Sequence, residues 1–417
     1  MTDEIKTIVK HKNKEFADKA LRVLGAAYRE YSEKPKSFEA DDLEKDLIFI
    51  GFTGMIDPCR PEVYEAIKEC KKAGIRPIMI TGDHIDTAVA IGKDLKIIQE
   101  ANEAVEGAQI EKLSDIELIE VVKVCSVFAR VQPEHKTRIV RALKAQDYIV
   151  AMTGDGVNDA PSIKAADIGV SMGITGTDVT KGASDMVLAD DNFATIVNAV
   201  EEGRKIYDNI RKVLQFQLST NMAEVIYVFI ASVLGITIVT PAQLLWINMV
   251  TDSTPGLALG MEKAEGNLMS RKPRPASEGV FSDGAGLDMV VQGLIMAGIV
   301  ILSFFLGEYM QNGAWKIAES ADGITMAFLT ANFIEMFHAI SMRSQKHSIF
   351  TLKSFNFWLL GAFLLTTALT LVVIYVPFFA NLFEFTQISL KEFLTAFGLA
   401  FSIVPIIEIL KLFKKKV

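Results

Sequence analysis

Six long apolar segments in the second half of the sequence constrain the fold more than any other feature. Residues 1 to about 210 are charged, and from about Leu214 onward long apolar segments alternate with short polar ones. A helix of about 20 apolar residues crosses a hydrocarbon core of roughly 30 Å. The segments are Gln217–Ile238, Pro241–Met261, Leu287–Tyr309, Ile324–Met342, Phe355–Val376 and Leu390–Phe413. We therefore expect a membrane bundle of these six helices rather than the alternative, a soluble helical bundle. A single helix is expected to run from Phe193 to Leu234, and the alternative is two helices with a break near Gly203.

The distribution of charge limits the functions open to the chain and orients its helices. The formal net charge of −8 argues against a nucleic-acid-binding protein, whose surface is basic. Lysine and arginine gather in the loop from Glu262 to Gly286, in the loop after Met342 and at the C-terminal end. The positive-inside rule places these segments, and with them the charged first half, on the cytoplasmic side. We expect a multi-pass protein of the cell membrane whose N-terminal domain and C-terminus are cytoplasmic.

Strand and helix patterns alternate through the charged first half. Such alternation predicts a mostly parallel sheet with helices on both faces. Ligands of such sheets bind at the carboxyl ends of the strands. Strands are expected at 46–56, 75–80, 121–129 and 148–152, and helices at 61–73, 86–95 and 134–145.

Two polar strings lie where the ligands of such a sheet bind. Thr81-Gly82-Asp83 follows the strand at 75–80, and read alone it is also compatible with a helix N-cap. The string TGDGVND at 153–159 follows the strand at 148–152, and its aspartates and glycines are not explained by a simple turn. A glycine turn that begins a helix presents backbone N–H groups to an anion. The strings therefore predict a phosphoryl site, and the absence of a G-x-x-x-x-G-K-[ST] string excludes a Walker-type one.

The chemistry of single side chains suggests how such a site works. Asp155 and Asp159 carry the hard carboxylate oxygens that Mg²⁺ prefers. Thr81 can donate a hydrogen bond to a phosphoryl oxygen, and Lys136 can neutralise charge that develops there. For Lys136 alone, a solvated lysine on the surface of a helix is the alternative.

Polar side chains also interrupt three of the apolar segments. Such groups are costly inside a membrane and indicate function, and spacings of three and four place them on one helix face. Carboxylate, amide and hydroxyl oxygens together favour a hard cation. Pro255 and Gly256 are expected to loosen the second helix and free backbone carbonyls as ligands. The alternative is a structural polar network, and His338 is expected to be structural. The candidate ligands are Asn221, Glu224, Asn248, Thr251, Asp252 and Glu335.

Several strings in the first half resemble signatures of the P-type ATPases, which belong to the haloacid-dehalogenase-like superfamily. MITGDH at 79–84, FARVQPEHK at 128–136 and MTGDGVNDAP at 152–161 are similar to strings of the family's phosphorylation domain. IDPCRPEV at 56–63 resembles its hinge segment, and ALRVLGAAYRE at 20–30 the end of its nucleotide-binding domain. The resemblance implies an α/β haloacid-dehalogenase-like phosphorylation domain with an incomplete parallel sheet, followed by an all-α bundle of six transmembrane spans.

The resemblance assigns a role to each residue of the phosphoryl site. Thr81 and Lys136 correspond to the pair that binds the phosphoryl group, and Asp155 to the Mg²⁺ ligand. Asn158 and Asp159 correspond to residues that support this ligand. ATP and Mg²⁺ are the cofactors that the resemblance implies.

Further cofactor-binding residues are implied in the same way. Asp83 lies where the family places a residue near the acyl phosphate. Gly82 and Arg130 belong to the matching phosphate-binding strings. Arg22 matches an arginine that reaches the nucleotide phosphates, and without the family it would be a helix-surface arginine.

The membrane half resembles the calcium pumps of the sarcoplasmic-reticulum type. The strings that carry this resemblance are STNMAEV at 219–225 and LLWINMVTD at 244–252. One implied Ca²⁺ site is complete in this chain and consists of Asn221, Glu224, Thr251, Asp252 and Glu335. A second would use Asn221, Asn248 and Asp252 with a glutamate from a helix that these 417 residues do not include. Mn²⁺ accepts the same oxygen ligands and is an alternative cargo.

The resemblance covers only the C-terminal half of such a pump. The 417 residues contain neither the DKTGT string with the family's nucleophilic aspartate nor the TGES actuator loop. The implied domains are the end of the nucleotide-binding domain (1–45), the phosphorylation domain without its nucleophile strand (46–205) and the transmembrane domain (206–417). The missing strand leaves sheet edges exposed.

Three functions are compatible with these observations. The first is part of an ATP-driven pump that exports Ca²⁺ from the cytosol, inactive by itself because it lacks the nucleophile. The second is a non-catalytic remnant, or a half-pump that pairs with a separate N-terminal half. The third is a membrane-anchored phosphatase that uses Asp57 as its nucleophile, although Asp57 lacks the expected D-x-D/T context.

Overall fold

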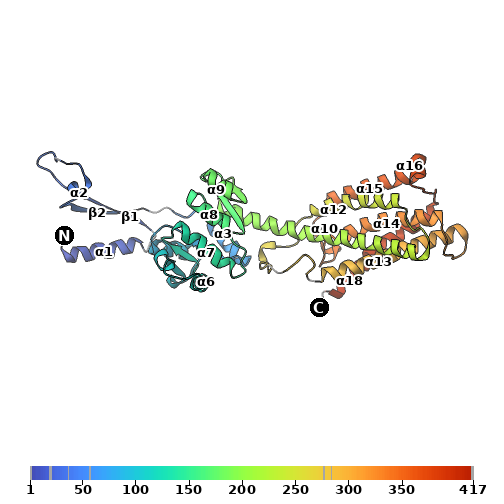
Figure 1. Cartoon of the computed structure of the whole chain (residues 1–417), viewed down its shortest axis with the longest axis horizontal. Coiled ribbons are helices and arrows are strands. Elements are labelled where there is room, and N and C mark those ends of the chain that lie inside the picture. The colour runs from blue at the N-terminus through green and yellow to red at the C-terminus, as the bar shows by residue number, and fades with distance from the viewer. Residues whose placement is uncertain are drawn as a thin grey trace. The chain divides into compact units, whose positions relative to one another are not determined.

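The chain forms two compact units in the computed structural model. The structure describes residues 2–17, 21–35, 37–55, 58–275, 278–282 and 284–414, apart from the side chains of Ala17, Arg22 and Lys414. The first unit is Met1–Val200 with Met269–Ala276, and the second is Glu201–Leu268 with Ser277–Val417. The labels of Figure 1 are used throughout.

Three small sheets organise the first unit. In the first sheet, β1 (Arg22–Tyr28) pairs antiparallel with β2 (Ile48–Met55). The second sheet is parallel, with β5 (Val127–Ala129) between β3 (Met79–Ile80) and β4 (Ala104–Glu106). The third is also parallel, with β7 (Ile168–Met172) between β6 (Ala151–Gly154) and β8 (Met186–Leu188).

Helices connect these strands, and their sequences carry the expected end signals. Pro61 and Pro133 begin two of them, where a missing N–H costs nothing. Ser114 and Glu117 form a reciprocal capping box at the start of a third. The helices are α1 (Asp3–Ala17), α2 (Ala40–Leu43), α3 (Pro61–Lys72), α4 (Ile85–Asp94), η1 (Ala101–Glu103), α5 (Gly107–Ile110), α6 (Asp115–Val124), α7 (Pro133–Lys144), η2 (Val157–Asp159), α8 (Ala160–Ala165) and α9 (Asp178–Ala183).

Strand β5 shows that helices cover both faces of its sheet. Successive strand residues point to opposite faces. Phe128 packs in one core with Leu118 of α6 and Ile139 of α7. Val127, on the other face, packs in a separate core with Ala88 of α4. The parallel α/β architecture expected from the sequence is therefore confirmed.

Two expected strands were wrong in part. The segment 46–56 was expected to be a buried strand of the parallel sheet, but β2 pairs antiparallel with β1 and is largely exposed. The segment 121–129 divides into the end of helix α6 and the short strand β5, because Asp115–Val124 continues the helix that Ser114 caps. Periodicity cannot separate a short apolar strand from the buried end of a helix.

The parallel strands form two separate three-stranded sheets. Among the described strands, β3 and β6 each have a neighbour on one side only. These are also the two strands that lead into the polar strings at 81–83 and 153–159. The expectation of an incomplete sheet with exposed edges thus applies to the two strands nearest the predicted phosphoryl site.

The second unit is helical. Among the described residues, five helical segments are long and apolar enough to cross a membrane: Phe193–Leu234, Ala285–Asn312, Ala321–Ser341, Phe357–Tyr375 and Leu390–Phe413. The first is one continuous helix, as expected. The helices are α10 (Phe193–Leu234), α11 (Pro241–Trp246), η3 (Ile247–Thr251), α12 (Ser253–Gly260), η4 (Leu268–Ser270), α13 (Ala285–Asn312), α14 (Ala321–Ser341), η5 (Ile349–Thr351), α15 (Phe357–Tyr375), α16 (Pro377–Leu382), α17 (Leu390–Phe401) and α18 (Ile403–Lys414). Of these, α10 and η4 each include residues of both units.

The second expected span, Pro241–Met261, is helical but broken. Its middle, η3, is a π-helix, in which the N–H of Asp252 bonds to the carbonyl of Ile247. The loosening was expected at Pro255 and Gly256, yet both lie inside α12. Pro255 has no N–H to offer the carbonyl of Thr251 four residues earlier, and the irregular turn accordingly lies before the proline. Such π-turns are frequent at functional sites.

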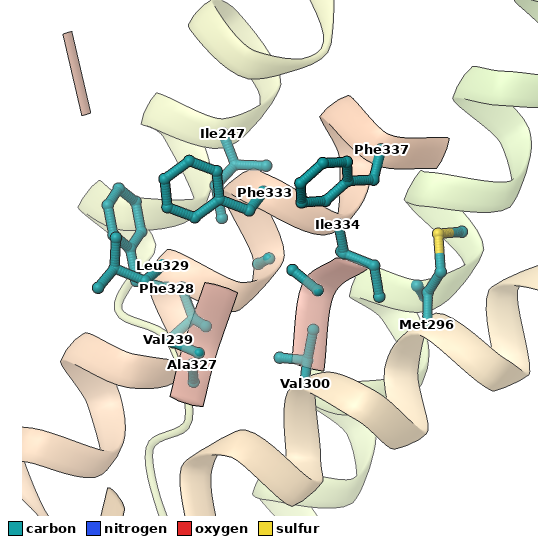
Figure 2. Packing of buried hydrophobic residues seen from close by; sticks show 14 of the residues in the cluster. Val239, Ile247, Met296, Val300, Ala327, Phe328, Leu329, Phe333, Ile334 and Phe337 are labelled. Atoms are coloured by element: carbon teal, nitrogen blue, oxygen red, sulfur yellow. The ribbon is translucent and has the colours of Figure 1, made fainter. Parts of the chain in front are cut away.

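Helix α14 is the centre of the helical unit. Nearly all of it is buried, and it packs against α13 at a point where only glycine fits: a Cβ at Gly307 would lie 2.8 Å from the Cα of Gly323. Small residues of this kind let membrane helices approach closely. Figure 2 shows Phe333, Ile334 and Phe337 of α14 in the apolar core that surrounds the helix.

Candidate functional site

The loops that follow β3 and β5 are tied together by their backbones. The N–H of Arg130 donates to the carbonyl of Asp83 at 3.0 Å, and the N–H of Val131 donates to that of Thr81 at 3.2 Å. Arg130 adopts a left-handed φ of 49°. Its carbonyl lies so close to Gly107 that a Cβ there would approach it to 2.3 Å. The two backbone hydrogen bonds hold the segment 81–83 beside the segment 130–136, as the predicted site requires.

The side chains of these loops are engaged with one another. The hydroxyl of Thr81 donates to the carboxylate of Asp83 at 2.8 Å and accepts from the Asp83 N–H at 3.1 Å. The guanidinium of Arg130 lies 3.4 Å from the carboxylate of Glu106. Thr81 can reach a phosphoryl oxygen by exchanging one local hydrogen bond, whereas the Arg130 side chain is directed to Glu106. Gly82 and Asp83 are exposed.

Asp159 organises the loop that follows β6. One of its carboxylate oxygens accepts a hydrogen bond from the Nζ of Lys136 at 2.6 Å. The other accepts the N–H groups of Asp155 and Gly156, each at 3.3 Å. Asp159 is buried against Gly154, where a Cβ would lie 2.5 Å from the Asp159 Cβ. Both oxygens of Asp159 therefore hold protein groups, and the ion pair joins helix α7 to the loop.

Asp155 is placed differently, at the exposed end of β6. Its backbone carbonyl accepts the N–H of Thr177 at 3.0 Å and the hydroxyl of Thr180 at 3.3 Å. Its carboxylate has no hydrogen bond to any residue that the structure describes, and Asn158 is exposed on the same loop. Mg²⁺ keeps several waters and needs only one or two protein carboxylates. Asp155 therefore fits a Mg²⁺ ligand, and Asp159 fits a supporting group.

The side chains of two predicted residues of the first half lie outside the described part of the chain. The backbone of Arg22 begins β1, but its side chain is not described. Asp57, the alternative nucleophile, is not described either.

In the second unit, two pairs of the predicted cation ligands meet across helices. The amide of Asn248 donates to both carboxylate oxygens of Glu224 at 3.0 Å, which joins η3 to α10. Asp252 and Glu335 share a side-chain hydrogen bond between the end of η3 and α14. Both of these residues are buried, with exposed fractions of 3% each. Asn221 is exposed.

Three further residues complete this polar group and were missed in the sequence. The hydroxyl of Thr220 donates to Asp252 at 3.5 Å, and the hydroxyl of Thr251 donates to Asn332 at 2.5 Å. Tyr227 lies in the same buried region. Their positions carried a signal, because Asn332 precedes Glu335 by three residues and Tyr227 follows Glu224 by three, which puts each on the same helix face.

The polar group has unused oxygen atoms. Asp252 Oδ1 and Glu335 Oε2 are buried and have no hydrogen-bond partner among the described residues. Buried oxygens without a partner are costly, and two buried carboxyl groups in contact need a proton or a cation between them. No three acidic, histidine or cysteine side chains converge on a single point in the described part of the chain. The carboxyl groups are thus gathered in one region without forming a closed metal cage.

His338 lies one turn beyond Glu335 and takes no part in this group. Its Nε2 is 2.8 Å from the hydroxyl of Ser219, and its ring stacks on Phe216 at 5.8 Å between centroids. These contacts agree with the structural role expected for it.

Comparison with known proteins follows the division into two halves. Residues 2–167 match the family described as haloacid dehalogenase-like hydrolase. Residues 236–413 match the family described as cation transporting ATPase, C-terminus.

Curated relatives match the whole chain. It is 43% identical to a calcium-transporting ATPase 1 of Bacillus cereus, over 100% of this chain and 48% of the relative. It is 44% identical to a calcium-transporting ATPase of Bacillus subtilis, over 95% of this chain and 44% of the relative. An endoplasmic reticulum-type calcium-transporting ATPase 3 of Arabidopsis thaliana is 36% identical over 95% of this chain and 42% of its own length. The chain thus spans about half the length of the curated relatives that it matches.

Proposed function

The chain belongs to the cation-transporting P-type ATPases, as their C-terminal half, and on this premise we propose that it carries Ca²⁺ across a membrane as part of an ATP-driven pump. The names of the relatives support Ca²⁺ as the cargo. The observation that carries the proposal is the pair of buried carboxyl groups of Asp252 and Glu335, with the half-buried Glu224 and the amide and hydroxyl neighbours of these residues. Hard oxygens of this kind suit Ca²⁺, which takes six to eight of them.

The ion site that we propose uses oxygens from three helical segments. Asn221 and Glu224 come from α10, Thr251 and Asp252 from η3 and its end, and Glu335 from α14. Asn248, which bonds to Glu224, is assigned to a second site that needs a further carboxylate. Mn²⁺ is the alternative cargo, because it accepts the same ligands.

In the first unit, we assign the loops after β3 and β6 to phosphoryl chemistry with ATP and Mg²⁺. Asp155 would hold Mg²⁺, which neutralises charge on the phosphoryl oxygens. Thr81 donates a hydrogen bond to the phosphoryl group, and Lys136 keeps a positive charge beside it while paired with Asp159. Asn158 supports the Mg²⁺ ligand. Gly82, Asp83, Arg130 and Arg22 are assigned to the phosphate and nucleotide contacts.

The nucleophile of this chemistry would come from outside these residues. The 417 residues contain no DKTGT string, and β3 and β6 each have an unpaired side among the described strands. A strand bearing the aspartate and pairing with both would unite the two parallel sheets. We propose that it belongs to the N-terminal half of the pump, whether in the same polypeptide or a separate one.

The proposed domains follow the same division. Residues 1–45 end the nucleotide-binding domain, 46–205 form the phosphorylation domain, and 206–417 form the membrane domain. The first two and the C-terminus are assigned to the cytoplasmic side, because the basic loops share that side. Transport would then run from the cytosol outward.

Direct binding of radioactive Ca²⁺ tests the ion site. The full chain is reconstituted in lipid nanodiscs and titrated at constant ionic strength. We expect one saturable Ca²⁺ per chain, and loss of binding in Asp252→Asn, because this change removes a carboxylate from the centre of the group. Asn312→Ala, at the end of α13, serves as a matched control and should bind as the unchanged chain does. Absence of saturable binding, or full binding by Asp252→Asn, contradicts the proposal.

Phosphorylation by radioactive ATP tests the missing nucleophile. The full chain alone should form no acid-stable phosphoenzyme. Co-expression with an N-terminal half that carries the DKTGT string should restore a Ca²⁺-dependent one, and Asp155→Asn in the same complex should lose it. A Ca²⁺-stimulated phosphoenzyme formed by the chain alone contradicts this assignment. If such a phosphoenzyme forms and Asp57→Asn still carries the radioactive phosphate, Asp57 is also excluded as the phosphate acceptor.

A further inference from the structure

Tyr227 places a phenol hydroxyl in the buried interior of the helical unit, where nothing described bonds to it. The side chain is 1% exposed, and its hydroxyl oxygen is buried without a hydrogen-bond partner among the described residues. Tyr227 follows Glu224 by three residues on α10, so the two side chains lie on one helix face. The phenol is therefore directed into the region of the proposed ion site.

A small cavity lies at the point where this face meets the neighbouring helices. Its volume is about 10 Å³, and its polar lining comes from Thr220, Glu224, Tyr227 and Glu335. The rest of the lining is apolar, and Figure 2 shows three of these side chains, Met296, Val300 and Ile334, near one another. A cavity of this size has room for about one water-sized body, so it suits a dehydrated ion or a single water.

The charged neighbours of the phenol are the carboxyl groups of the same site. Glu224, Asp252 and Glu335 all act on it electrostatically. Like the Tyr227 hydroxyl, Asp252 Oδ1 and Glu335 Oε2 are buried and have no hydrogen-bond partner in the part of the chain that the structure describes. Three unpartnered oxygens on side chains that belong to one buried region point to a common ligand that carries positive charge.

The energy of burial argues against a purely structural hydroxyl. A buried polar group without a partner costs about 1–3 kcal/mol, and phenylalanine would fill the same space without that cost. The tyrosine therefore has a reason to be present only when something bonds to its oxygen. A divalent cation and a carboxylate together give the phenol oxygen its partners. A neutral phenol can offer a lone pair to the ion while its O–H donates a hydrogen bond to a carboxylate.

We propose that Tyr227 is a ligand of the transported cation, with its neutral hydroxyl oxygen bound to Ca²⁺ and its O–H donating a hydrogen bond to the carboxylate of Glu335. The inference rests on the proposed function. The added neutral oxygen helps to reach the six to eight ligands of Ca²⁺ without adding negative charge. It also lies one turn from Glu224 toward the C-terminal end of α10, and so closes that side of the site.

Ca²⁺ binding by Tyr227→Phe in the full chain in nanodiscs tests the inference, because this change removes only the hydroxyl. We expect the Kd for Ca²⁺ to rise about tenfold, which corresponds to about 1.4 kcal/mol, with one ion still bound per chain. Tyr375→Phe, on the partly exposed helix α15, is the matched control and should leave the Kd unchanged. An unchanged Kd in Tyr227→Phe overturns the inference while leaving the proposed function intact.

Thermal unfolding separates a ligand from a structural hydroxyl. Without Ca²⁺, Tyr227→Phe should be at least as stable as the unchanged chain, and Ca²⁺ should stabilise it less. A loss of stability without Ca²⁺, with the same gain on adding Ca²⁺, identifies a structural hydroxyl and overturns the inference.

Terbium luminescence supplies a readout that depends steeply on the distance between the bound ion and an aromatic side chain. Tb³⁺ replaces Ca²⁺ and is sensitised by a tyrosine beside it. We expect strong sensitised emission from the unchanged chain and from Tyr375→Phe, and a large loss in Tyr227→Phe at saturating Tb³⁺. Equal emission from all three overturns the inference. If the unchanged chain binds neither ion, the proposed function itself fails, which is a distinct result.

Discussion

Lys136 and Asp159 form a 2.6 Å ion pair that joins helix α7 to the loop after β6. The side chains are 21% and 10% exposed. The second oxygen of Asp159 holds the N–H groups of Asp155 and Gly156, so one carboxylate sets both the position of the lysine and the course of the loop. The carbonyl of Thr81 accepts a hydrogen bond from the N–H of Val131, which belongs to the segment that leads into α7. Thr81, Lys136, Asp155 and Asp159 thus belong to one connected set of contacts.

The ion pair of Lys136 and Asp159 is expected to stabilise the first unit. A double-mutant cycle with Lys136→Met and Asp159→Asn should give a coupling energy of about 1–3 kcal/mol, because both groups are largely buried. The exposed pair Lys68–Glu65, 3.0 Å apart, is the control and should give less than about 0.5 kcal/mol. Hydrogen exchange of the full chain in a urea series measures both values. Equal coupling in the two pairs contradicts the prediction.

Gly154 is expected to tolerate no side chain. In Gly154→Ala, the new Cβ would lie 2.5 Å from the Cβ of Asp159 and would displace the loop that carries Asp155. We expect a loss of about 1–3 kcal/mol in the free energy of unfolding. Gly182→Ala, in helix α9 with open space around it, should be neutral or slightly stabilising. The same exchange measurement compares the two, and a stable Gly154→Ala chain contradicts the close packing.

Asp191 makes the loop at 173–175 sensitive to acid. Its carboxylate accepts the backbone N–H groups of this loop at 2.6, 3.0 and 2.8 Å. Desolvation raises the pKa of Asp191, but these hydrogen bonds outweigh it and lower the pKa to about 2. Because the pKa is about 3.9 when unfolded, the carboxylate stabilises the loop fully above that pH. The stabilisation is lost as the pH falls through about 2.

Exchange of the amides in 173–175 checks this dependence. The unchanged chain and Asp191→Asn are compared at the same pH, which cancels the intrinsic exchange rates. The unchanged chain should be better protected at pH 5, and the difference should shrink steadily between pH 4 and pH 2. A difference that does not depend on pH would assign the effect to shape rather than to charge.

Asn332 is expected to position Thr251 for the cation. It is fully buried, and it accepts the Thr251 hydroxyl at 2.5 Å while donating to the carbonyl of Phe328 at 2.8 Å. Asn332→Ala leaves Thr251 without this partner, and we expect the Kd for Ca²⁺ to rise about tenfold, or about 1.4 kcal/mol. Asn332→Gln should restore part of the affinity. Binding of radioactive Ca²⁺ measures these affinities. Unchanged affinity in the alanine variant excludes a role of Asn332 in positioning Thr251.

Much of the architecture followed from local properties of the sequence. The lengths of the apolar segments predicted the long apolar helices of the second unit except at Pro241–Met261, which is broken, because the thickness of a bilayer sets the length of a helix that crosses it. The continuous helix of residues 193–234 followed in the same way. The strings around Thr81 and Asp155 indicated phosphoryl chemistry, and spacings of three placed Asn221 and Glu224 on one face, because helix geometry is local.

Only the tertiary structure decided which of these groups meet. Whether residues 48–55 pair with β1 or join the parallel sheet depends on strands far away in the chain, and β-strand preference depends on such neighbours. The π-turn at Ile247–Thr251 turns Asp252 toward Thr220 and Thr251 toward Asn332. The rotation of one helix against another sets such contacts, and no spacing along a single helix encodes it. For the same reason, the sequence identified Glu224 and Glu335 as polar groups in apolar helices, but only the packing of the helices brought both, with Tyr227, to the lining of one cavity.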